Sequence, residues 1–340
     1  SSSWRKSVST IYKAHRKKDE KVDWSAVFKC HDGFILTLKK LGVIVCNSQS
    51  AEADDLIFVW STLLNHNKEN AIIISGDNDL LQLVNFDQAS NSNTIYYNKF
   101  DKNLHVFNKF NQWLTEPELN TASSDIFNMH KSVYHDTKSA LKNIVKSSKM
   151  EIKEVAVNDF VFKKILIGDE GDGVTPLHVK LQGTRVYRVT EKHANDVINL
   201  FKENKIFVRS SHFFNDESIL EICEHAKKVI KIDKPISEIV EKWKLNRDLV
   251  YLHNDCIPKP VLEASMTLVE NYLANKEQLA VHQLADKNYI LDNSEYVKPV
   301  ITEETFFKTK TLEAVKTTAV VTESQPEQAF NADFWDSLTK

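Results

Sequence analysis

This sequence predicts an α/β fold with a parallel sheet, followed by a helical domain, and three local patterns carry that prediction. From Asp54 onward, apolar residues recur at the three- and four-residue spacing of an amphipathic helix. Residues 71–74, which come next, are wholly apolar and isoleucine-rich, as in a short strand covered on both faces. An earlier helix-like stretch, residues 24–41, ends at Gly42 and precedes a second apolar run at residues 43–46. This alternation of helix and strand favours an α/β layer with parallel strands.

The rest of the chain divides into less regular segments. Residues 94–97 and 104–107 resemble two strands joined by a polar turn, and residues 160–167 resemble a short helix. Residues 115–150 are polar without a clean period, and we interpret them as an insertion with a helix near residues 139–145. We predict a catalytic-type core over residues 1–168, a helical domain over residues 169–299, and a flexible tail over residues 300–340.

Composition places the chain among ordinary globular proteins. Of its 340 residues, 42% are hydrophobic and 27% are charged, which suits about two domains, and the net charge is −3. The four cysteines form no CxxC pair, so they indicate reduced thiols of an intracellular protein and neither a zinc site nor a disulfide framework. No apolar run is long enough to span a bilayer and no signal peptide is present, so we expect an intracellular location and no membrane partner.

Carboxylates gather at both ends of the central helix and strand. They are Glu52, Asp54, Asp55, Asp77 and Asp79. In open α/β sheets the helix start and the strand's carboxyl end share the rim on which ligands bind. Carboxylates this close require a cation between them or raise one another's pKa, and Mg²⁺ or Mn²⁺ suits oxygen-only ligands. The alternative is structural, because acidic residues also cap helices and mark turns.

A third acidic cluster lies in the glycine-rich segment of residues 168–173, which reads GDEGDG and contains Asp169 and Asp172. A turn without chemistry is its alternative interpretation. An EF-hand is excluded for both this segment and the Asp77 segment, because their twelfth positions are Lys180 and Gln88 instead of a carboxylate.

The first residues are basic and aromatic. The cations and rings are Trp4, Arg5, Lys6, Tyr12, Lys13, His15, Arg16, Lys17 and Lys18. Interleaved cations and rings suit backbone phosphates and stacked bases. A solvated charged helix is the structural alternative.

The three acidic motifs, in this order, resemble the 5′-nuclease (flap endonuclease-like) superfamily, and most closely its branch of T-even-type phage ribonuclease H and 5′–3′ exonucleases. The motifs stand here as Glu52-Ala53-Asp54-Asp55, as residues 75–83 (SGDNDLLQL), and as Gly168-Asp169-Glu170-Gly171-Asp172. Residues 1–25 are similar to the helical arch of that family, and residues 249–258 resemble a feature near the end of its second domain. The fold that this implies is a PIN-like nuclease core with an arch, followed by a helical clamp on duplex DNA.

The resemblance also implies roles for individual residues. Two Mg²⁺ ions, or Mn²⁺, would activate water and stabilise the leaving oxygen of a phosphodiester. The first ion would be served by Glu52, Asp55 and Asp77, and the second by Asp79, Asp169 and Asp172, with Asp54 as an outer ligand. Arg5 and Lys13 would contact the scissile phosphate. Further nucleic-acid contacts would come from Trp4, Tyr12, Arg16, Lys17, Lys180, Arg185, Arg188 and Lys192.

The sequence departs from the family pattern in three places. Two metal-binding aspartates that the family carries before the arch are absent, together with the first strands of the sheet, which predicts a fragment or a partner nuclease segment supplied in trans. The glycine-rich hairpin that follows the third motif in many relatives is also absent. Residues 115–150 are extra sequence.

The tail ends in an aromatic and acidic tip that contains Phe330, Phe334, Trp335 and Leu338. A polar tether with such a tip suits docking on a partner through a short helix, and a sliding clamp or single-strand binding protein is the expected partner of a replication nuclease. The alternative is a terminal helix packed on its own domain.

Three functions therefore compete. The favoured one is a metal-dependent 5′ nuclease that removes primers or flaps from DNA and RNA–DNA hybrids in phage-type replication, in the cytoplasm of a bacterial host. The second is a catalytically incomplete DNA-binding subunit. The third is an aspartate-dependent phosphatase, which would use Asp77 and Asp79 after the apolar strand.

Overall fold

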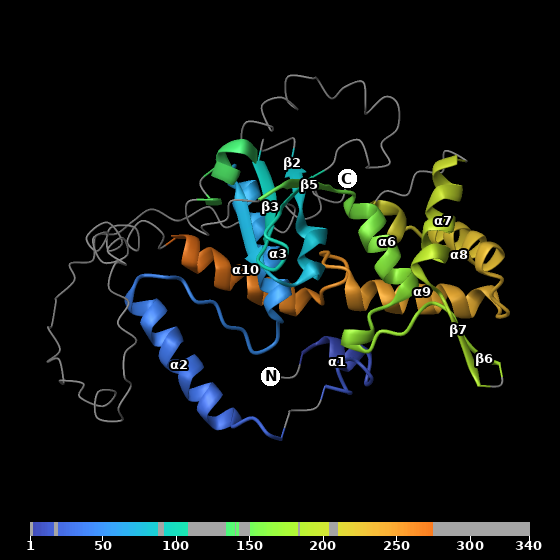
Figure 1. Cartoon of the computed structure of the whole chain (residues 1–340), viewed down its shortest axis with the longest axis horizontal. Coiled ribbons are helices and arrows are strands. Elements are labelled where there is room, and N and C mark those ends of the chain that lie inside the picture. The colour runs from blue at the N-terminus through green and yellow to red at the C-terminus, as the bar shows by residue number, and fades with distance from the viewer. Residues whose placement is uncertain are drawn as a thin grey trace, which may run out of the picture.

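The computed structural model describes residues 3–16, 20–87, 92–107, 134–139, 141–142, 150–182, 184–203 and 210–274. Its centre is a mixed five-stranded sheet in the order β1-β3-β4-β5, with β2 beside β3 (Figure 1). The strands are β1 (Ala71–Ser75), β2 (Asn85–Asp87), β3 (Ser92–Asn98), β4 (Leu104–Phe107) and β5 (Ile152–Val155). The pairings β1–β3 and β4–β5 are parallel, whereas β2–β3 and β3–β4 are antiparallel. The predicted α/β fold is therefore confirmed, with a sheet that is mixed and not purely parallel.

Strand β1 forms as predicted, but only one of its faces is covered. Ala71 and Ile73 are 5% and 8% exposed, whereas Ile72 and Ile74 are 45% and 56% exposed. The prediction of cover on both faces was wrong, because the described elements pack on the face of β1 that carries Ala71 and Ile73 and leave the opposite face exposed. The predicted strand at residues 43–46 is also wrong, since these residues pair with no strand in the described part of the chain.

Helix α3 (Ala53–His66) realises the predicted amphipathic helix and packs against α10 (Lys259–Ala274). Leu56, Val59 and Leu63 of α3 form one core cluster with Val269 of α10. A buried polar contact joins α3 to the sheet, because Thr94 Oγ1 donates to Asn65 Oδ1 at 2.7 Å. This contact places the end of α3 near the start of β1, because Thr94 lies opposite Ala71 in the parallel pairing. The start of α3 therefore lies at the rim where β1 ends.

A helical layer packs beside the sheet. It comprises α6 (Val157–Ile167), α7 (Glu191–Glu203), α8 (Asp216–Ile230), α9 (Ile236–Val250) and the 3₁₀ turn η3 (Ser210–Phe213). Its core holds Phe162 against Trp243 and Phe201, with ring centroids 5.2 and 5.8 Å apart, close to T-shaped packing. Ile73 and Tyr96 of the sheet belong to the same buried cluster, so sheet and helices share one continuous core.

The N-terminal part contains α1 (Arg5–Val8) and α2 (Trp24–Lys40). Helix α2 confirms the predicted helix at residues 24–41, yet none of its residues is buried, and Phe28 and Phe34 are 49% and 60% exposed. In Figure 1 it stands apart from the sheet and from the helical layer.

Other sequence predictions fall partly outside the described residues. Residues 134–139 and 141–142 are helical, near the helix expected at residues 139–145, and residues 115–133, 140 and 143–149 of the insertion lie outside the described residues. The whole tail of residues 300–340 also lies outside the described residues. None of the helices that the structure describes combines the length and apolar character needed to cross a bilayer.

Candidate metal centre

Two short 3₁₀ turns carry the second and third acidic motifs. They are η1 (Asn78–Leu83), which follows β1, and η2 (Glu170–Asp172), which follows α6. Each is capped by the aspartate directly before it, whose carboxylate accepts a backbone hydrogen bond: Asp77 from the N–H of Asp79 at 3.0 Å, and Asp169 from the N–H of Asp172 at 3.2 Å. The structural alternative of capping therefore applies to Asp77 and Asp169, but each carboxylate keeps acceptor capacity for a further ligand.

The turn at η2 depends on glycine at both ends. Gly168 and Gly173 both have φ of +75°, a conformation that L-residues with a side chain rarely adopt. A Cβ at Gly168 would lie 2.3 Å from the carbonyl oxygen of Val174, and a Cβ at Gly173 would lie 2.6 Å from that of Ile11. The second contact shows that the N-terminal segment lies directly against the acidic turn.

Three carboxylates from these turns converge. Oxygens of Asp79, Asp169 and Asp172 all lie within 4.8 Å of one another, and all three residues are partly exposed. The ammonium of Lys164, in the last turns of α6, forms ion pairs with Asp79 and, at 2.8 Å, with Asp169. Burial raises the pKa of Asp79, and the charge of Asp169 adds to that rise, which the adjacent Lys164 opposes. Burial acts the same way on Asp169, but the hydrogen bond and charge of Lys164 hold its pKa below the usual value.

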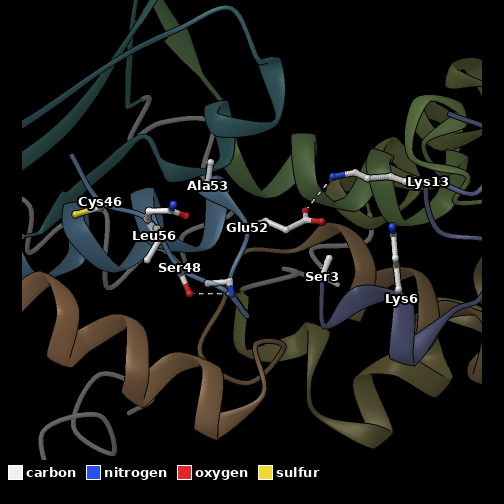
Figure 2. A pocket seen from close by; sticks show the side chains of 10 residues that line it. Ser3, Lys6, Lys13, Cys46, Ser48, Glu52, Ala53 and Leu56 are labelled. Atoms are coloured by element: carbon white, nitrogen blue, oxygen red, sulfur yellow. Dashed lines mark hydrogen bonds and ion pairs between the residues drawn. The ribbon is translucent and has the colours of Figure 1, made fainter. Parts of the chain in front are cut away.

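Glu52, at the start of α3, links this cluster to the N-terminal segment. The Lys13 ammonium lies 2.9 Å from Glu52 Oε2 and 3.6 Å from Asp172 Oδ2, as its approach to Glu52 in Figure 2 shows. The Tyr12 hydroxyl lies within hydrogen-bond distance of the same two oxygens, at 3.1 and 2.9 Å. Burial and both neighbouring carboxylates raise the pKa of Tyr12, so it remains a neutral donor between them. The backbone of Lys13 has φ of +53°, a strained value for a residue with a side chain, and its N–H donates to the Asp172 carbonyl at 2.7 Å.

Beside Glu52 the surface is hollowed. A cavity of about 370 Å³ lies between α1 and the start of α3, with Lys6 and Lys13 on one side and Cys46 and Leu56 on the other (Figure 2). Its wall thus combines ammonium groups with apolar side chains.

Asp54 completes the acidic rim. Burial raises the pKa of Asp54 to about 6, and the nearby charge of Asp77 contributes to that rise. This proximity confirms that the start of α3 and the end of β1 meet, as the sequence predicts.

Asp55 has a different environment, because it is fully buried and all its contacts are internal. The Arg5 guanidinium donates to both of its oxygens, at 2.8 and 3.2 Å. Trp4 Nε1 and the Glu52 backbone N–H donate to Oδ2, each at 2.9 Å. Burial works to lower the pKa of Arg5, but the Asp55 charge and hydrogen bond raise it overall, so the Arg5 guanidinium stays protonated.

The carboxyl end of α9 forms hydrogen bonds with segments next to all three acidic motifs and so fixes their relative positions. Arg5 Nε donates to the Leu249 carbonyl at 3.1 Å. Gln82 of η1 donates to the Val250 carbonyl at 3.2 Å and accepts from the Leu252 N–H at 2.8 Å. Asn246 donates to the Ile165 and Thr175 carbonyls, at 2.8 and 3.0 Å, on either side of the η2 turn. This arrangement gives a physical role to the residues near position 249 that the sequence resemblance singled out.

The predicted site residues therefore separate into groups. The structure brings together Glu52, Lys13, Asp79, Asp169 and Asp172, with Asp54 and Asp77 adjacent. Trp4, Arg5 and Tyr12 are 7%, 3% and 2% exposed, and their polar groups point to carboxylates and not to solvent.

The remaining predicted residues lie at the surface or outside the described chain. Arg16 is 55% exposed and forms an ion pair with Asp172. Lys180, Arg185, Arg188 and Lys192 are exposed, and Arg188 forms an ion pair with Glu170 of η2 at 3.4 Å. Lys17 and the tail residues Phe330, Phe334, Trp335 and Leu338 lie outside the described residues.

Sequence reasoning missed Lys164, Gln82 and Asn246. Gln82 stands within the quoted second motif and Lys164 lies just before the third, so their closeness to the motifs was the available signal. Asn246 gave none, since its bonds join segments that are remote in sequence.

The donor set fits a hard divalent cation. Asp79, Asp169 and Asp172 offer only oxygen, from turns that leave them partly exposed, and their spacing leaves a cation as the natural compensation. Lys164 occupies that electrostatic role in this structure, because its ammonium bridges two of the three carboxylates.

The comparison with protein-family models agrees with the motif resemblance. Residues 1–111 match a family model described as the 5′-3′ exonuclease, N-terminal resolvase-like domain. This match, over the part that holds the first two acidic motifs, confirms the predicted resemblance to the 5′-nuclease superfamily. Among solved structures, the chain is similar to the T5 D15 protein co-crystallised with metal ions, at 17% identity and a TM-score of 0.44, over 78% of this chain and 80% of that chain. A comparison with curated proteins gave no significant match.

Proposed function

We propose that this protein is a metal-dependent 5′ nuclease that hydrolyses phosphodiester bonds in nucleic acids with free 5′ ends, including flaps and RNA–DNA hybrids. The observation that carries the proposal is the convergence of Asp79, Asp169 and Asp172 from two motifs that are 90 positions apart in sequence, from 79 to 169. The match of residues 1–111 to an exonuclease domain supports the same reaction.

We divide the carboxylates into two groups of metal ligands. Asp79, Asp169 and Asp172 would hold one Mg²⁺ or Mn²⁺ ion, and Glu52, Asp54 and Asp77 would hold the second. We place Asp54 in this second group instead of Asp55, because Arg5 and Trp4 already occupy both oxygens of Asp55. Divalent cations held this way polarise phosphoryl oxygens and lower the pKa of a coordinated water.

The chain's own cations complete the site. Lys13 lies between Glu52 and Asp172 and is 20% exposed, so its ammonium can turn from these carboxylates to a phosphate that arrives between them. Arg16 contacts Asp172 from the solvent side and offers a planar donor pair to a second phosphate oxygen. Arg5 acts indirectly by fixing Asp55 and the start of α3.

The test uses the full chain with a 5′-labelled flap and a 5′-labelled RNA–DNA hybrid, in Mg²⁺ and in EDTA. We expect cleavage in Mg²⁺ alone, and loss of cleavage in Asp169→Asn. Asp196→Asn, on the exposed face of α7, is the matched control and should cleave like the parent protein. Cleavage that persists in EDTA or in Asp169→Asn would overturn the proposal, and tight binding without cleavage would identify the DNA-binding subunit instead.

The phosphatase alternative has weaker support. Its nucleophile would be Asp77, but that carboxylate caps η1 by accepting the Asp79 N–H. Hydrolysis of p-nitrophenyl phosphate that is lost in Asp77→Asn would revive it.

Partner docking through the tail stays a prediction, because residues 300–340 lie outside the described part. Deletion of residues 325–340 should abolish binding to a sliding clamp or single-strand binding protein and leave flap cleavage intact. Unchanged binding after the deletion would remove the idea.

A further inference from the structure

One element of the helical half is exposed on both of its faces. Among the described residues, the strands β6 (Val179–Gln182) and β7 (Arg185–Arg188) pair only with each other, and they form an antiparallel hairpin that extends beyond the helical layer in Figure 1. Val179, Val186 and Tyr187 are 42%, 60% and 47% exposed. Side chains on both faces of the hairpin are therefore exposed, and a two-stranded hairpin gains little stability from its own burial, so this surface is available to a partner.

The charge of the hairpin indicates the kind of partner. Residues 179–188 read VKLQGTRVYR, with three cations and no carboxylate. Register places Lys180 opposite Tyr187, and alternation places Arg185 on the same face as Tyr187. One face thus presents two cations and an aromatic ring, a combination suited to phosphates and base edges.

The ion pairs that the hairpin makes are weak ones. Lys180 lies 3.3 Å from Asp233 and Arg188 lies 3.4 Å from Glu170, and both pairs are exposed. Exposed pairs of this kind contribute at most about 1 kcal/mol, so phosphate can replace the carboxylates.

The base of the hairpin is rigid and lies close to the acidic turn. Leu177 and Val189 are 3% and 1% exposed, and the Leu177 N–H donates to the Leu166 carbonyl at 2.8 Å. Val174 pairs with Asp169 in an isolated bridge just before the hairpin. Seven positions separate Asp172 from Val179 (179 − 172), and such a length spans at most about 25 Å.

We propose that the β6–β7 hairpin is a recognition ribbon that enters the major groove of the B-form duplex beside the cleavage point. The major groove, about 12 Å wide, admits a two-stranded β-ribbon, whereas the major groove of A-form helices is too narrow for side chains to read. This inference rests on the proposed function, which supplies the nucleic-acid substrate. It adds that the β6–β7 hairpin makes the contact, that the contact is in the major groove, and that the duplex is B-form. It assigns to a hairpin what the sequence resemblance had assigned to a helical clamp.

Because the acidic turn and the hairpin are linked so closely, the contacted groove lies within about one turn of the cut. Duplex arms of about one turn or longer should therefore bind through the hairpin, and arms of about half a turn, about 5 base pairs, should not.

The experiment measures equilibrium binding in EDTA, where no cleavage is needed. Its probes are a labelled DNA duplex of about 20 base pairs, an RNA–DNA hybrid of the same sequence and the single strand. The test variant is Arg185→Ala/Tyr187→Ala. Lys228→Ala, an exposed cation on α8, controls for loss of charge alone. Urea unfolding of each variant confirms that the fold is intact.

We expect the hairpin variant to bind the DNA duplex about tenfold more weakly, and to change by less than about twofold on the hybrid and on the single strand. The parent protein should protect guanine N7, a major-groove atom, from methylation, and the variant should not. Equal losses on all three probes, unchanged duplex affinity, or protection confined to the minor groove would each overturn the proposal.

These outcomes are separate from those of the nuclease test. Duplex affinity that depends on the hairpin, in a protein that does not cleave, would support the ribbon and refute the nuclease. If the protein cleaves but the hairpin substitutions leave its duplex affinity unchanged, the nuclease proposal is supported and the ribbon proposal is refuted.

Discussion

Asp55 and the Asp79–Asp169–Asp172 cluster are two carboxylate sites of this molecule with opposite electrostatics. Asp55 is fully buried, and Arg5, Trp4 and the α3 backbone satisfy its oxygens. The cluster is partly exposed: Lys164 bridges Asp79 and Asp169, and Lys13 and Arg16 pair with Asp172. Because Lys13 is shared with Glu52, and Asp54 and Asp77 are adjacent, these carboxylates outnumber the cations. A carboxylate whose hydrogen bonds are complete within the fold contributes to the structure, whereas a surplus of negative charge at the surface is suited to a ligand.

The strongest way to break this contrast is to remove the partner of the buried carboxylate. Arg5→Ala leaves the buried Asp55 side chain without its ion-pair partner, and we expect the free energy of unfolding to fall by about 3–5 kcal/mol. Urea unfolding measures the effect, with Lys6→Ala, an exposed residue of the same helix, as the control. A loss below about 1 kcal/mol would show that the ion pair with Arg5 contributes little to stability and that the contrast is not real.

The converse substitution belongs in the cluster. Asp172→Asn removes one ligand oxygen charge at a partly exposed position, so we expect stability within about 1 kcal/mol of the parent protein. Cleavage of the labelled flap in Mg²⁺ should fall by at least about a hundredfold, since metal-ion catalysis supplies several kcal/mol. Normal activity in this variant would move Asp172 into the structural group.

The buried Arg5–Asp55 pair was harder to predict from the sequence than the partly exposed acidic cluster. The acidic motifs, α3 and β1 could be predicted because spacing along the chain determines which side chains share a helix face or a strand end. Arg5 was predicted to contact the scissile phosphate, yet it lies 50 positions before its partner Asp55 and is buried against it. Which carboxylate Arg5 pairs with depends on how segments that are remote in sequence pack together, and no local sequence pattern indicates it.

The same limit explains the other differences. The apolar run at residues 43–46 does not become a strand, and β1 has one open face, because pairing and cover depend on neighbours that are remote in sequence. The β6–β7 hairpin was not predicted either. Its sequence contains residues that favour strands, but the hairpin forms where it does because Leu177 and Val189, at its two ends, are buried in the helical layer.

Lys164 offers a way to sharpen the contrast within the cluster. Its ammonium lies where a divalent cation would be attracted, so Lys164→Met removes a competing charge. We expect Mg²⁺ to bind about fivefold more tightly, which corresponds to about 1 kcal/mol of relieved repulsion. Isothermal titration calorimetry measures the affinity, and Lys163→Met, from the neighbouring position of α6, is the control. Weaker binding would mean that Lys164 orients the carboxylates and does not compete with the ion.

The smallest effect concerns pH and Asp54. Its pKa of about 6 in the folded protein lies above the ordinary aspartate value of 3.8, because burial and the charge of Asp77 favour the neutral form. Folding therefore gains from protonation, and this gain is complete below pH 3.8 and is lost as the pH rises through about 6. In EDTA, the free energy of unfolding of the parent protein should decline relative to that of Asp54→Asn between pH 4 and pH 6, by about 1 kcal/mol after solvent screening. Added Mg²⁺ should reverse the sign of the difference above pH 6, because a cation favours the ionised carboxylate. A pH-independent difference in both conditions would place Asp54 with Asp55, among the carboxylates that the fold itself neutralises.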